Sequence, residues 1–400
     1  MIELARTDTS IVGRWWWTVD RWLLVAILLL PAIGAILVMA ASPAVADRLG
    51  LDSFHFVRRQ LLVLGPALAV IVAASMLSPL WVRRGAVLLF AAAMVMLLLT
   101  LAIGPEIKGA QRWLPLGGLM VQPSEFVKPA LAVVAAWMLA EQARNTGFQG
   151  TAISAALMVL VAGMLLLQPD VGMAGLVILV WFIQAFIAGI RMRWVAGLVG
   201  AGAAAAIGAY AAFPHVASRI DRFLDPASGD SYQVDTALNA FGNGGLFGAG
   251  PGEGVIKNIL PDAHADFIFA VAGEEFGMFV TVAVVSIFAF VVLRGLTRLA
   301  RERDMFMLLA AAGLLVQFGM QAAINMGVNM RLLPAKGMTL PFLSYGGSSL
   351  LALALAMGVV LALTCSRAGG NTSPSNALRA KRAAHNPAPG ATDLRTAARP

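Results

Sequence analysis

The stretch W-L-L-V-A-I-L-L-L-P-A-I-G-A-I-L-V-M-A-A-S, from Trp22 to Ser42, carries no charged side chain over about the length that crosses the hydrocarbon core of a bilayer. Further long apolar runs follow, and charged residues make up only 12% of the 400-residue chain. Soluble domains carry about 25% charged residues, so we expect the apolar surface of this chain to face lipid. Continuous runs, rather than alternating residues, favour helices over a β-barrel. The sequence therefore predicts an all-α integral membrane protein.

Ten spans are expected, and their number places both termini on one side of the membrane. The least certain division falls at Gln168-Pro169-Asp170, between the fifth and sixth spans. Loops with Arg83-Arg84, with Arg191 and Arg193, and from Arg294 to Arg303 lie on the side of the N-terminus, which indicates that this side is cytoplasmic. The predicted spans are 22–42, 59–79, 86–104, 123–140, 152–168, 171–190, 194–213, 266–293, 304–325 and 348–366.

The expected organisation is a cytoplasmic N-terminus (1–21), a ten-span membrane domain (22–366) and a cytoplasmic tail (367–400). The tail has almost no large apolar residues and is expected to be disordered. Two long extracytoplasmic loops are expected, 104–122 and about 214–265. The single cysteine, Cys365, forms no internal disulfide. The net charge of +8 is spread over short loops and the tail, which does not indicate nucleic-acid binding.

Ionisable residues lie in or beside the apolar spans, and Asp266 in L-P-D-A-H-A-D-F-I-F-A is the most informative of them. A carboxylate at the edge of a span is costly unless it pairs, hydrogen-bonds or faces water, so such groups indicate chemistry or transport. If Asp266 begins a helix, it could instead be a simple N-cap or first-turn acid. Helical spacing then places Glu274 about 80° from Asp266 and Glu275 opposite, so at most one of the two glutamates is expected to share its site.

Two basic positions have both a structural and a functional interpretation. Lys128 follows Glu125 by three residues at the start of the fourth span, so the two could form a plain ion pair or a substrate-facing pair. Lys128 lies well inside the span, which favours the substrate-facing pair over a plain ion pair. Arg112, beside Trp113, could be an interfacial anchor or could bind phosphate through its planar guanidinium.

Glycines between 242 and 254 suggest a nucleotide loop, but neither the P-loop pattern nor a strict G-x-G-x-x-G after a strand occurs. Tight backbone packing is the simpler interpretation, and backbone amides around an anion are the alternative. The histidines and the cysteine lack zinc-ligand spacing. A serine hydrolase is disfavoured because no G-x-S-x-G elbow occurs.

Six stretches together resemble one family, the SEDS proteins of shape, elongation, division and sporulation. The similarity runs from about residue 22 to 366, and the motif Pro334-Ala335-Lys336-Gly337 resembles the division branch more than the elongation branch. The departures are mild: Asp262 stands where Glu is common, and Ala265 where Thr is common. The stretches are Gly109–Trp113, Gln122–Lys128, Gln168–Gly172, Leu260–Phe269, Glu274–Gly277 and Leu333–Ser349.

The resemblance implies a ten-span fold and an activity, the polymerisation of lipid II into glycan strands on the outer face of the bacterial inner membrane at the division septum. It places the catalytic role on Asp266. The expected substrate-binding residues are Arg112, Glu125, Lys128, His264, Lys336 and Ser344. The implied partners are a class B penicillin-binding transpeptidase and other divisome membrane proteins.

In the corresponding hypothesis Asp266 is a general base that removes the proton of a sugar 4-hydroxyl, and a lipid pyrophosphate leaves as an anion. One base and positive charge suffice for this step, unlike the paired carboxylates of glycoside hydrolysis. Arg112, Lys128 and Lys336 are the candidate pyrophosphate ligands. A divalent cation, Mg²⁺ or Mn²⁺, could share that role, although no pattern specifies one. A lipid II transporter and a non-catalytic divisome scaffold remain the alternatives.

Overall fold

The computed structural model describes residues 10–107, 109–212, 217–218, 221, 232–334 and 337–365. The chain divides into two compact units. The smaller comprises Met1–Thr18 and Cys365–Pro400, and its described part contains helix α1 (Ile11–Thr18). The larger, Val19–Thr364, contains every other described helix and strand. The predicted tail lies outside the described residues.

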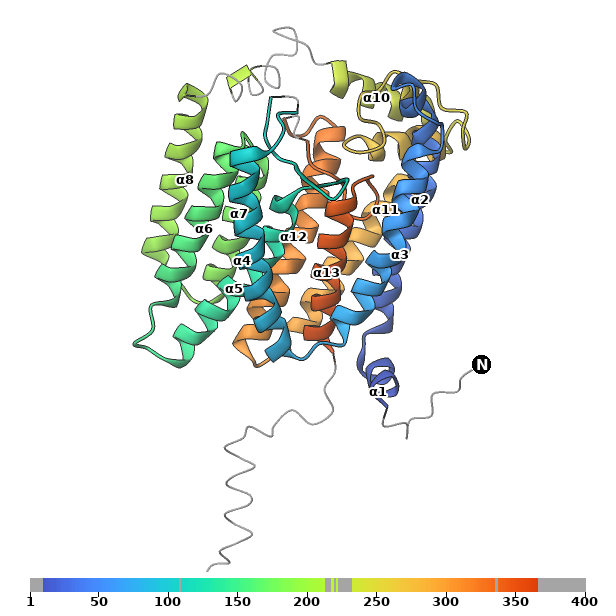
Figure 1. Ribbon diagram of the computed structural model, residues 1–400. Coiled ribbons are helices and arrows are strands. Elements are labelled where there is room, and N and C mark those ends of the chain that lie inside the picture. Colours follow the sequence, from blue (N-terminus) through green and yellow to red (C-terminus); the bar gives the residue numbers. More distant parts are fainter. Residues whose placement is uncertain are drawn as a thin grey trace, which may run out of the picture. The chain divides into compact units, whose positions relative to one another are not determined.

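Ten long helices run side by side between the two ends of the larger unit (Figure 1). Each overlaps one of the ten predicted spans, which confirms the all-α membrane fold. Among the described residues, eight of the ten are long and apolar enough to cross a bilayer, and α7 with 17 residues is slightly shorter. They are α2 (Arg21–Arg48), α3 (His55–Ser75), α4 (Pro79–Ile103), α5 (Pro123–Arg144), α6 (Gly150–Leu167), α7 (Val171–Ile187), α8 (Met192–Ala212), α11 (Ile268–Leu299), α12 (Met305–Asn329) and α13 (Gly347–Thr364).

Several helix ends follow from local chemistry. Helix α4 begins at Pro79 rather than at the predicted residue 86, because proline has a preorganised φ and needs no N–H partner in the first turn. The turn 168–170 does separate two helices. Asp170 caps α7 by accepting the N–H of Met173 at 3.3 Å, which satisfies one free donor at the helix start.

Small residues let the central helices approach closely. Helix α5 packs against α4, α6, α12 and α13, and most of its length is buried. Where α13 crosses α3, a Cβ on Gly358 would lie 2.7 Å from the Cβ of Ala74, so only glycine fits there. Such contacts are the main source of helix association in lipid, where burial of apolar surface gives little driving force.

Several described elements outside the ten spans were not predicted, among them a hairpin and a helix. Strands β1 (Leu114–Leu116) and β2 (Leu119–Val121) form an antiparallel hairpin whose turn is Gly117-Gly118, both with positive φ. A Gly-Gly pair suits this tight turn because glycine has no Cβ to oppose a positive φ. Helix α10 (Tyr232–Gly244) lies within the long loop predicted at 214–265.

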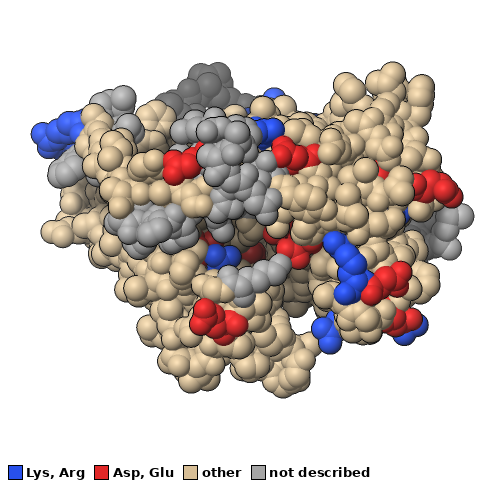
Figure 2. Space-filling view, turned by 90° about the horizontal axis from the view of Figure 1, so that it is seen from above, with Lys and Arg blue, Asp and Glu red and all other residues tan. Residues whose placement is uncertain are grey.

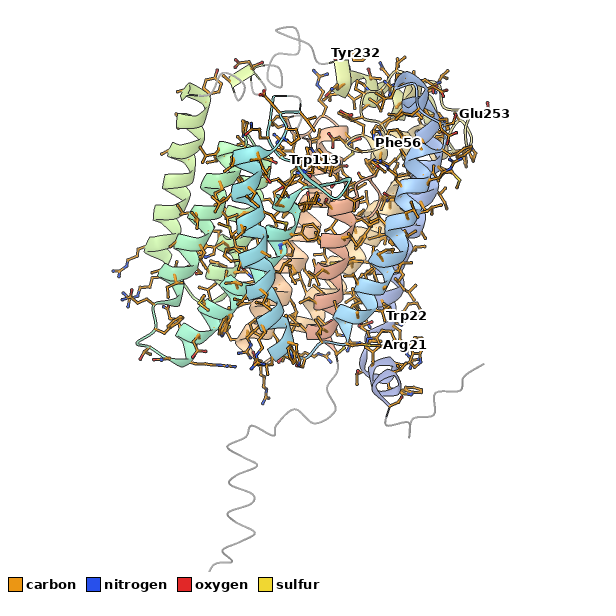
Figure 3. All side chains as sticks on the ribbon, in the orientation of Figure 1. Arg21, Trp22, Phe56, Trp113, Tyr232 and Glu253 are labelled. Carbon is orange, nitrogen blue, oxygen red and sulfur yellow. The ribbon has the colours of Figure 1, made fainter. Side chains whose placement is uncertain are left out.

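The hairpin, α10 and the start of α11 all lie at one end of the unit, the end at which α5, α7 and α13 begin. We call it the Asp266 end, and it is uppermost in Figure 1. Phe56, Trp113, Tyr232 and Glu253 lie there, whereas Arg21 and Trp22 lie at the opposite end (Figure 3).

Candidate active site

Asp266 lies in the turn that leads into α11 and not in the helix itself. The helix begins at Ile268, and its N-cap residue is Phe267, which makes no side-chain capping bond. The interpretation of Asp266 as an N-cap or first-turn acid is therefore wrong. The predicted angles between Asp266 and the two glutamates around one helix do not apply either, because Asp266 precedes the helix. The side chain of Asp266 is half-buried.

Hydrogen bonds from two other segments hold the main chain of the Asp266 turn. The N–H of Tyr345 donates to the carbonyl of His264 at 2.9 Å, and the Ser344 hydroxyl donates to that of Ala265 at 2.6 Å. On α12, Asn325 and Asn329 both donate to the carbonyl of Asp266, at 2.8 and 3.0 Å. Three consecutive carbonyls are thus fixed from outside the turn, which is the support that a precisely placed catalytic group requires.

Two of the predicted substrate-binding residues serve as part of this support. Ser344 is 4% exposed, and its oxygen also accepts the N–H of Leu340 at 2.8 Å. The ring of His264 packs against those of Phe56 and Tyr345, with centroids 4.3 and 5.3 Å away, and these two rings also contact each other. A direct contact of Ser344 or His264 with a substrate stays a prediction.

The segment after Lys336 passes beside the Asp266 carboxylate. A Cβ added to Gly337 would lie 3.2 Å from Oδ2 of Asp266, which leaves little room for any other residue at this position. The same segment is tied to α12, because Asn325 donates to the carbonyl of Met338 at 2.7 Å. Lys336 itself lies outside the described residues.

Glu125 and Lys128 form a buried ion pair, with Nζ 3.0 Å from Oε2 and both side chains at most 2% exposed. The Lys128 ammonium also donates to Oε1 of Gln321 at 3.2 Å and contacts the sulfur of Met173 at 3.2 Å. Gln321 in turn donates to the carbonyl of Thr339 at 3.1 Å. The pair is therefore connected, through α12, to the segment that flanks Asp266.

Arg112 reaches the turn between α6 and α7. It donates to the carbonyl of Pro169 at 2.7 Å and lies 3.6 Å from the Asp170 carboxylate. Burial raises the pKa of Asp170, although Arg112 and the Met173 N–H both act to lower it. The Arg112 side chain is 24% exposed, so the protein does not enclose it completely. These contacts support the structural interpretation of Arg112, and its binding of phosphate stays a prediction.

The glycine-rich segment, 244–254, packs its backbone directly on α11, where this helix is broken at Gly277 (φ 77°, ψ −176°). The N–H groups of Ala249 and Gly250 donate to the carbonyls of Glu274 and Glu275. A Cβ on Gly248 would collide with the carbonyl of Glu275. The glycines therefore serve close packing here, as the simpler interpretation predicts.

Both glutamates of α11 point into the glycine-rich segment and its continuation. Glu274 is fully buried and accepts the backbone N–H groups of Val255, Ile256 and Lys257 at 2.7–2.8 Å. Glu275 accepts the N–H of Gly252 at 2.7 Å and pairs with the Lys257 ammonium. The backbone amides thus surround an anion, but the anion is a side chain of the same protein.

Sequence reasoning missed Lys257. This residue is 5% exposed and, besides Glu275, donates to the carbonyls of Gly252 and of Ala40 on α2. The only signal was a lone lysine between Ile256 and Asn258, 17 and 18 positions before the two glutamates. We call Lys257, Glu274 and Glu275 the loop clip, since together they fasten the segment that precedes the Asp266 turn.

Acidic and basic side chains gather around a hollow in the surface of the Asp266 end (Figure 2). Within the described residues, no group of three or more His, Cys, Asp or Glu side chains is arranged to hold a metal ion. The described part of the site thus combines one half-buried acid with a partly exposed guanidinium and a buried ion pair.

Residues 21–368 match the family model FTSW_RODA_SPOVE, described as cell cycle protein. The chain belongs to this family. The match covers every predicted site residue, and it confirms the SEDS resemblance seen in the sequence.

Curated relatives of this family member extend over nearly its whole length. The probable peptidoglycan glycosyltransferase FtsW of Caulobacter vibrioides is 44% identical over 366 residues, which cover 91% of this chain and 94% of the relative. The protein of the same name from Legionella pneumophila is 35% identical over 355 residues, which cover 86% of this chain and 90% of that one.

Solved structures share the fold of this family member. A chain from a structure titled "Structural coordination of polymerization and crosslinking by a peptidoglycan synthase complex" aligns with a TM-score of 0.69 at 28% identity, covering 86% of this chain and 97% of that one. The rod shape determining protein RodA of Thermus thermophilus aligns with a TM-score of 0.64 at 28% identity, covering 87% and 97%.

Proposed function

We propose that this chain is a peptidoglycan glycosyltransferase that polymerises lipid II into glycan strands, with Asp266 as the general base. The family membership and the names of its curated relatives support the activity. The observation that carries the assignment of the base is the placement of Asp266. It is a half-buried acid at one end of a membrane bundle, on a turn whose three carbonyls are held from α12 and from Ser344–Tyr345.

In the proposed reaction the Asp266 carboxylate removes the proton of a sugar 4-hydroxyl as its oxygen attacks the anomeric carbon of a second, lipid-linked sugar. The bond from that carbon to the pyrophosphate breaks, and the lipid pyrophosphate leaves as an anion. Since this leaving group needs no protonation, one positioned base is enough. A single displacement inverts the anomeric carbon, so the linkage in the product has the opposite configuration to that of the donor.

Positive charge has to stabilise the departing pyrophosphate. Arg112 is suited to this role because its guanidinium is partly exposed while Asp170 and Pro169 fix its direction. Lys336 is covalently joined to Gly337, whose backbone passes beside the Asp266 carboxylate. Lys128 acts indirectly, because it is fully buried and its ammonium is held by Glu125, Gln321 and Met173.

The proposal places the Asp266 end on the outer face of the bacterial inner membrane and both termini in the cytoplasm. Its support is the positive-inside rule, since the arginines at 83–84, 144 and 294–303 lie at the opposite end. We propose that the protein acts at the division septum with a class B penicillin-binding transpeptidase and other divisome membrane proteins. A related solved complex combines polymerization with crosslinking, as its title states.

Polymerisation of lipid II in detergent tests the proposal, because transport across a bilayer has no meaning there. The purified chain is incubated with lipid II alone or together with the transpeptidase, and products are separated by gel electrophoresis. We expect glycan strands with inverted linkages in the presence of the partner. A transporter or a scaffold forms none, so the absence of strands in both conditions, from a protein that still unfolds cooperatively, would overturn the proposal.

A further inference from the structure

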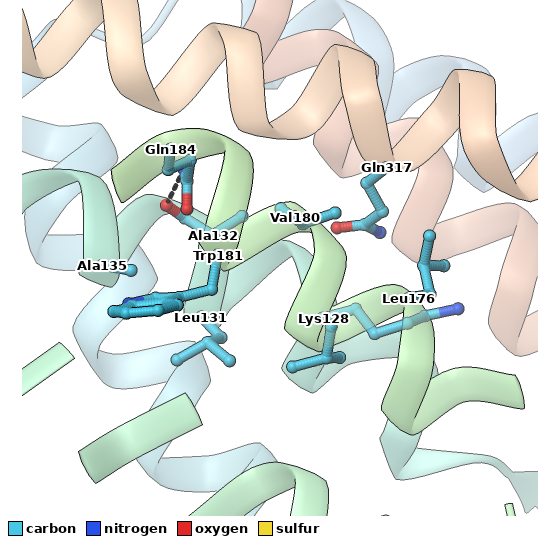
Figure 4. Close-up of a pocket in the computed structure, with 10 residues that line it drawn as sticks. Lys128, Leu131, Ala132, Ala135, Leu176, Val180, Trp181, Gln184 and Gln317 are labelled. Atoms are coloured by element: carbon cyan, nitrogen blue, oxygen red, sulfur yellow. Dashed lines mark hydrogen bonds between the residues drawn. The ribbon is translucent and has the colours of Figure 1, made fainter. Parts of the chain in front are cut away.

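A cavity lies inside the bundle between α5, α7 and α12, and Asp266 is not among the residues that line it (Figure 4). Most of its wall is apolar and includes Leu131, Leu176 and Trp181. Three polar side chains interrupt this wall: Lys128, Gln184 and Gln317. All three are at most 3% exposed, so they are buried within the bundle.

The two glutamines each present an amide oxygen that lacks a partner. Oε1 of Gln184 and Oε1 of Gln317 are buried, and neither accepts a hydrogen bond from any described residue. Figure 4 shows the Gln317 oxygen directed towards Val180, another residue of the cavity wall. Leaving a buried acceptor without a donor is energetically unfavourable, so two of them in one cavity indicate a ligand that donates hydrogen bonds.

The orientation of the Gln184 amide is fixed, so rotating it cannot supply the donor. Its nitrogen donates to the carbonyls of Ala132 and Leu309, at 2.8 and 3.0 Å. Exchanging the nitrogen and the oxygen would set the amide oxygen against both of these carbonyl oxygens. Gly313 gives the side chain its space, since a Cβ there would collide with the amide. The oxygen of Gln184 must therefore find its donor elsewhere.

We propose that this cavity is a hydration site, in which water donates hydrogen bonds to the amide oxygens of Gln184 and Gln317. The space suits the ligand, because the cavity has room for about one water molecule. Two acceptors match the two O–H groups of water. No carboxylate is among the residues that line the cavity, which disfavours a metal cation, and the lone pairs of the two oxygens disfavour an anion.

The hydration site extends the polar network that contains the Glu125–Lys128 ion pair. Gln317 lies one helical turn from Gln321, which accepts a hydrogen bond from Lys128. Burying an ion pair in an apolar interior is unfavourable unless polar neighbours compensate for the lost hydration, and water beside the Lys128 side chain would reduce that cost. This inference does not depend on the proposed enzymatic activity.

Radiolytic hydroxyl-radical labelling of the native chain in ¹⁸O water tests the proposal, because radicals formed from a bound water attack the side chains beside it. The matched comparison is between leucines of equal reactivity. Leu131 and Leu176 line the cavity and are 3 and 2% exposed, whereas Leu139 and Leu363 have the same exposure and do not line it. Mass spectrometry should show several-fold more ¹⁸O at the first pair. Equal labelling of the two pairs would overturn the proposal.

The variant Gln317→Leu supplies a second test, since it removes one of the two acceptors. We expect ¹⁸O labelling of Trp181 to fall several-fold relative to the native chain, while labelling of the exposed Trp22 stays the same. Undiminished labelling of Trp181 in a folded variant would remove Gln317 from the site. The labelling of Leu131 and Leu176 in the native chain decides the question even if this variant fails to fold.

Discussion

Replacing Lys257 by methionine should open the glycine-rich segment while the helices of the bundle stay folded. Among the described residues, Lys257 is the only cation that forms a hydrogen bond or an ion pair with Glu275. The side chain of Glu275 is 0% exposed. Methionine has a similar length but neither charge nor donors. The variant therefore leaves a buried carboxylate unpaired and releases the carbonyls of Ala40 and Gly252.

The expected size of the effect follows from the burial of the pair. Removing one partner of a buried ion pair costs about 3–5 kcal/mol, because the remaining charge stays in an apolar surrounding. Each 1.4 kcal/mol is a factor of ten, so the open state of the segment should gain roughly two to three and a half orders of magnitude in population. A second change, Glu275→Gln, removes the unpaired charge and should recover most of this loss.

Amide hydrogen exchange measured by mass spectrometry reads this opening directly. The amides of Gly252, Val255, Ile256 and Lys257 are bound by the two glutamates, so their exchange should accelerate strongly in Lys257→Met and much less in the double variant. Peptides from α5 should exchange as in the native chain. Unchanged protection of residues 252–257 in the single variant would refute the loop clip.

The remaining predictions concern three other places in the chain. Lys128→Ala should weaken polymerisation while the protein still inserts, because it leaves the Glu125 carboxylate buried without its cation; an unchanged turnover would make Lys128 purely structural. Gly337→Ala should lower the polymerisation rate with little change in melting temperature, since its Cβ would crowd the Asp266 carboxylate at 3.2 Å, and a normal rate would contradict this geometry. The pKa of Asp20 is lowered: burial acts to raise it, but a backbone N–H of α2 and two arginines of α11 outweigh burial. The stability that Asp20 contributes is therefore complete above its ordinary pKa of 3.8 and is lost as the pH falls through the lowered value. Asp20→Asn should then lose less melting temperature than the native chain on acidification, and an equal loss in both would refute the assignment.

The spans could be predicted from sequence because bilayer thickness sets the length of an apolar run. The ten expected spans all became helices, and even the three-residue division before Val171 was found. The hairpin was missed although Gly117-Gly118 is a strong turn signal, because each strand has only three residues. Some helix starts, such as Pro79, lie several residues from their predicted positions. A helix start depends on which residues suit its first turn rather than on hydropathy.

The candidate site was less predictable, because its contacts join residues that are distant in sequence. Asn325 and Asn329 hold the main chain of Asp266. In the sequence they are two polar residues in an apolar helix, and nothing in that pattern shows that they bind the Asp266 turn. The importance of Lys257 depends on the break at Gly277, which lets the loop fold back onto both glutamates. The two glutamates were assigned by helical geometry relative to Asp266, which failed because Asp266 lies outside the helix.

The most direct measurement of the central claim is the polymerisation rate of Asp266→Asn compared with that of Asp262→Asn. Both acids lie in the same turn and are half-buried, and asparagine tolerates the φ of 49° at Asp262. We predict that Asp266→Asn retains its fold and lipid II binding but forms no glycan strands, while Asp262→Asn keeps most of its activity. Native-like strand formation by Asp266→Asn would contradict the assignment of Asp266 as the base.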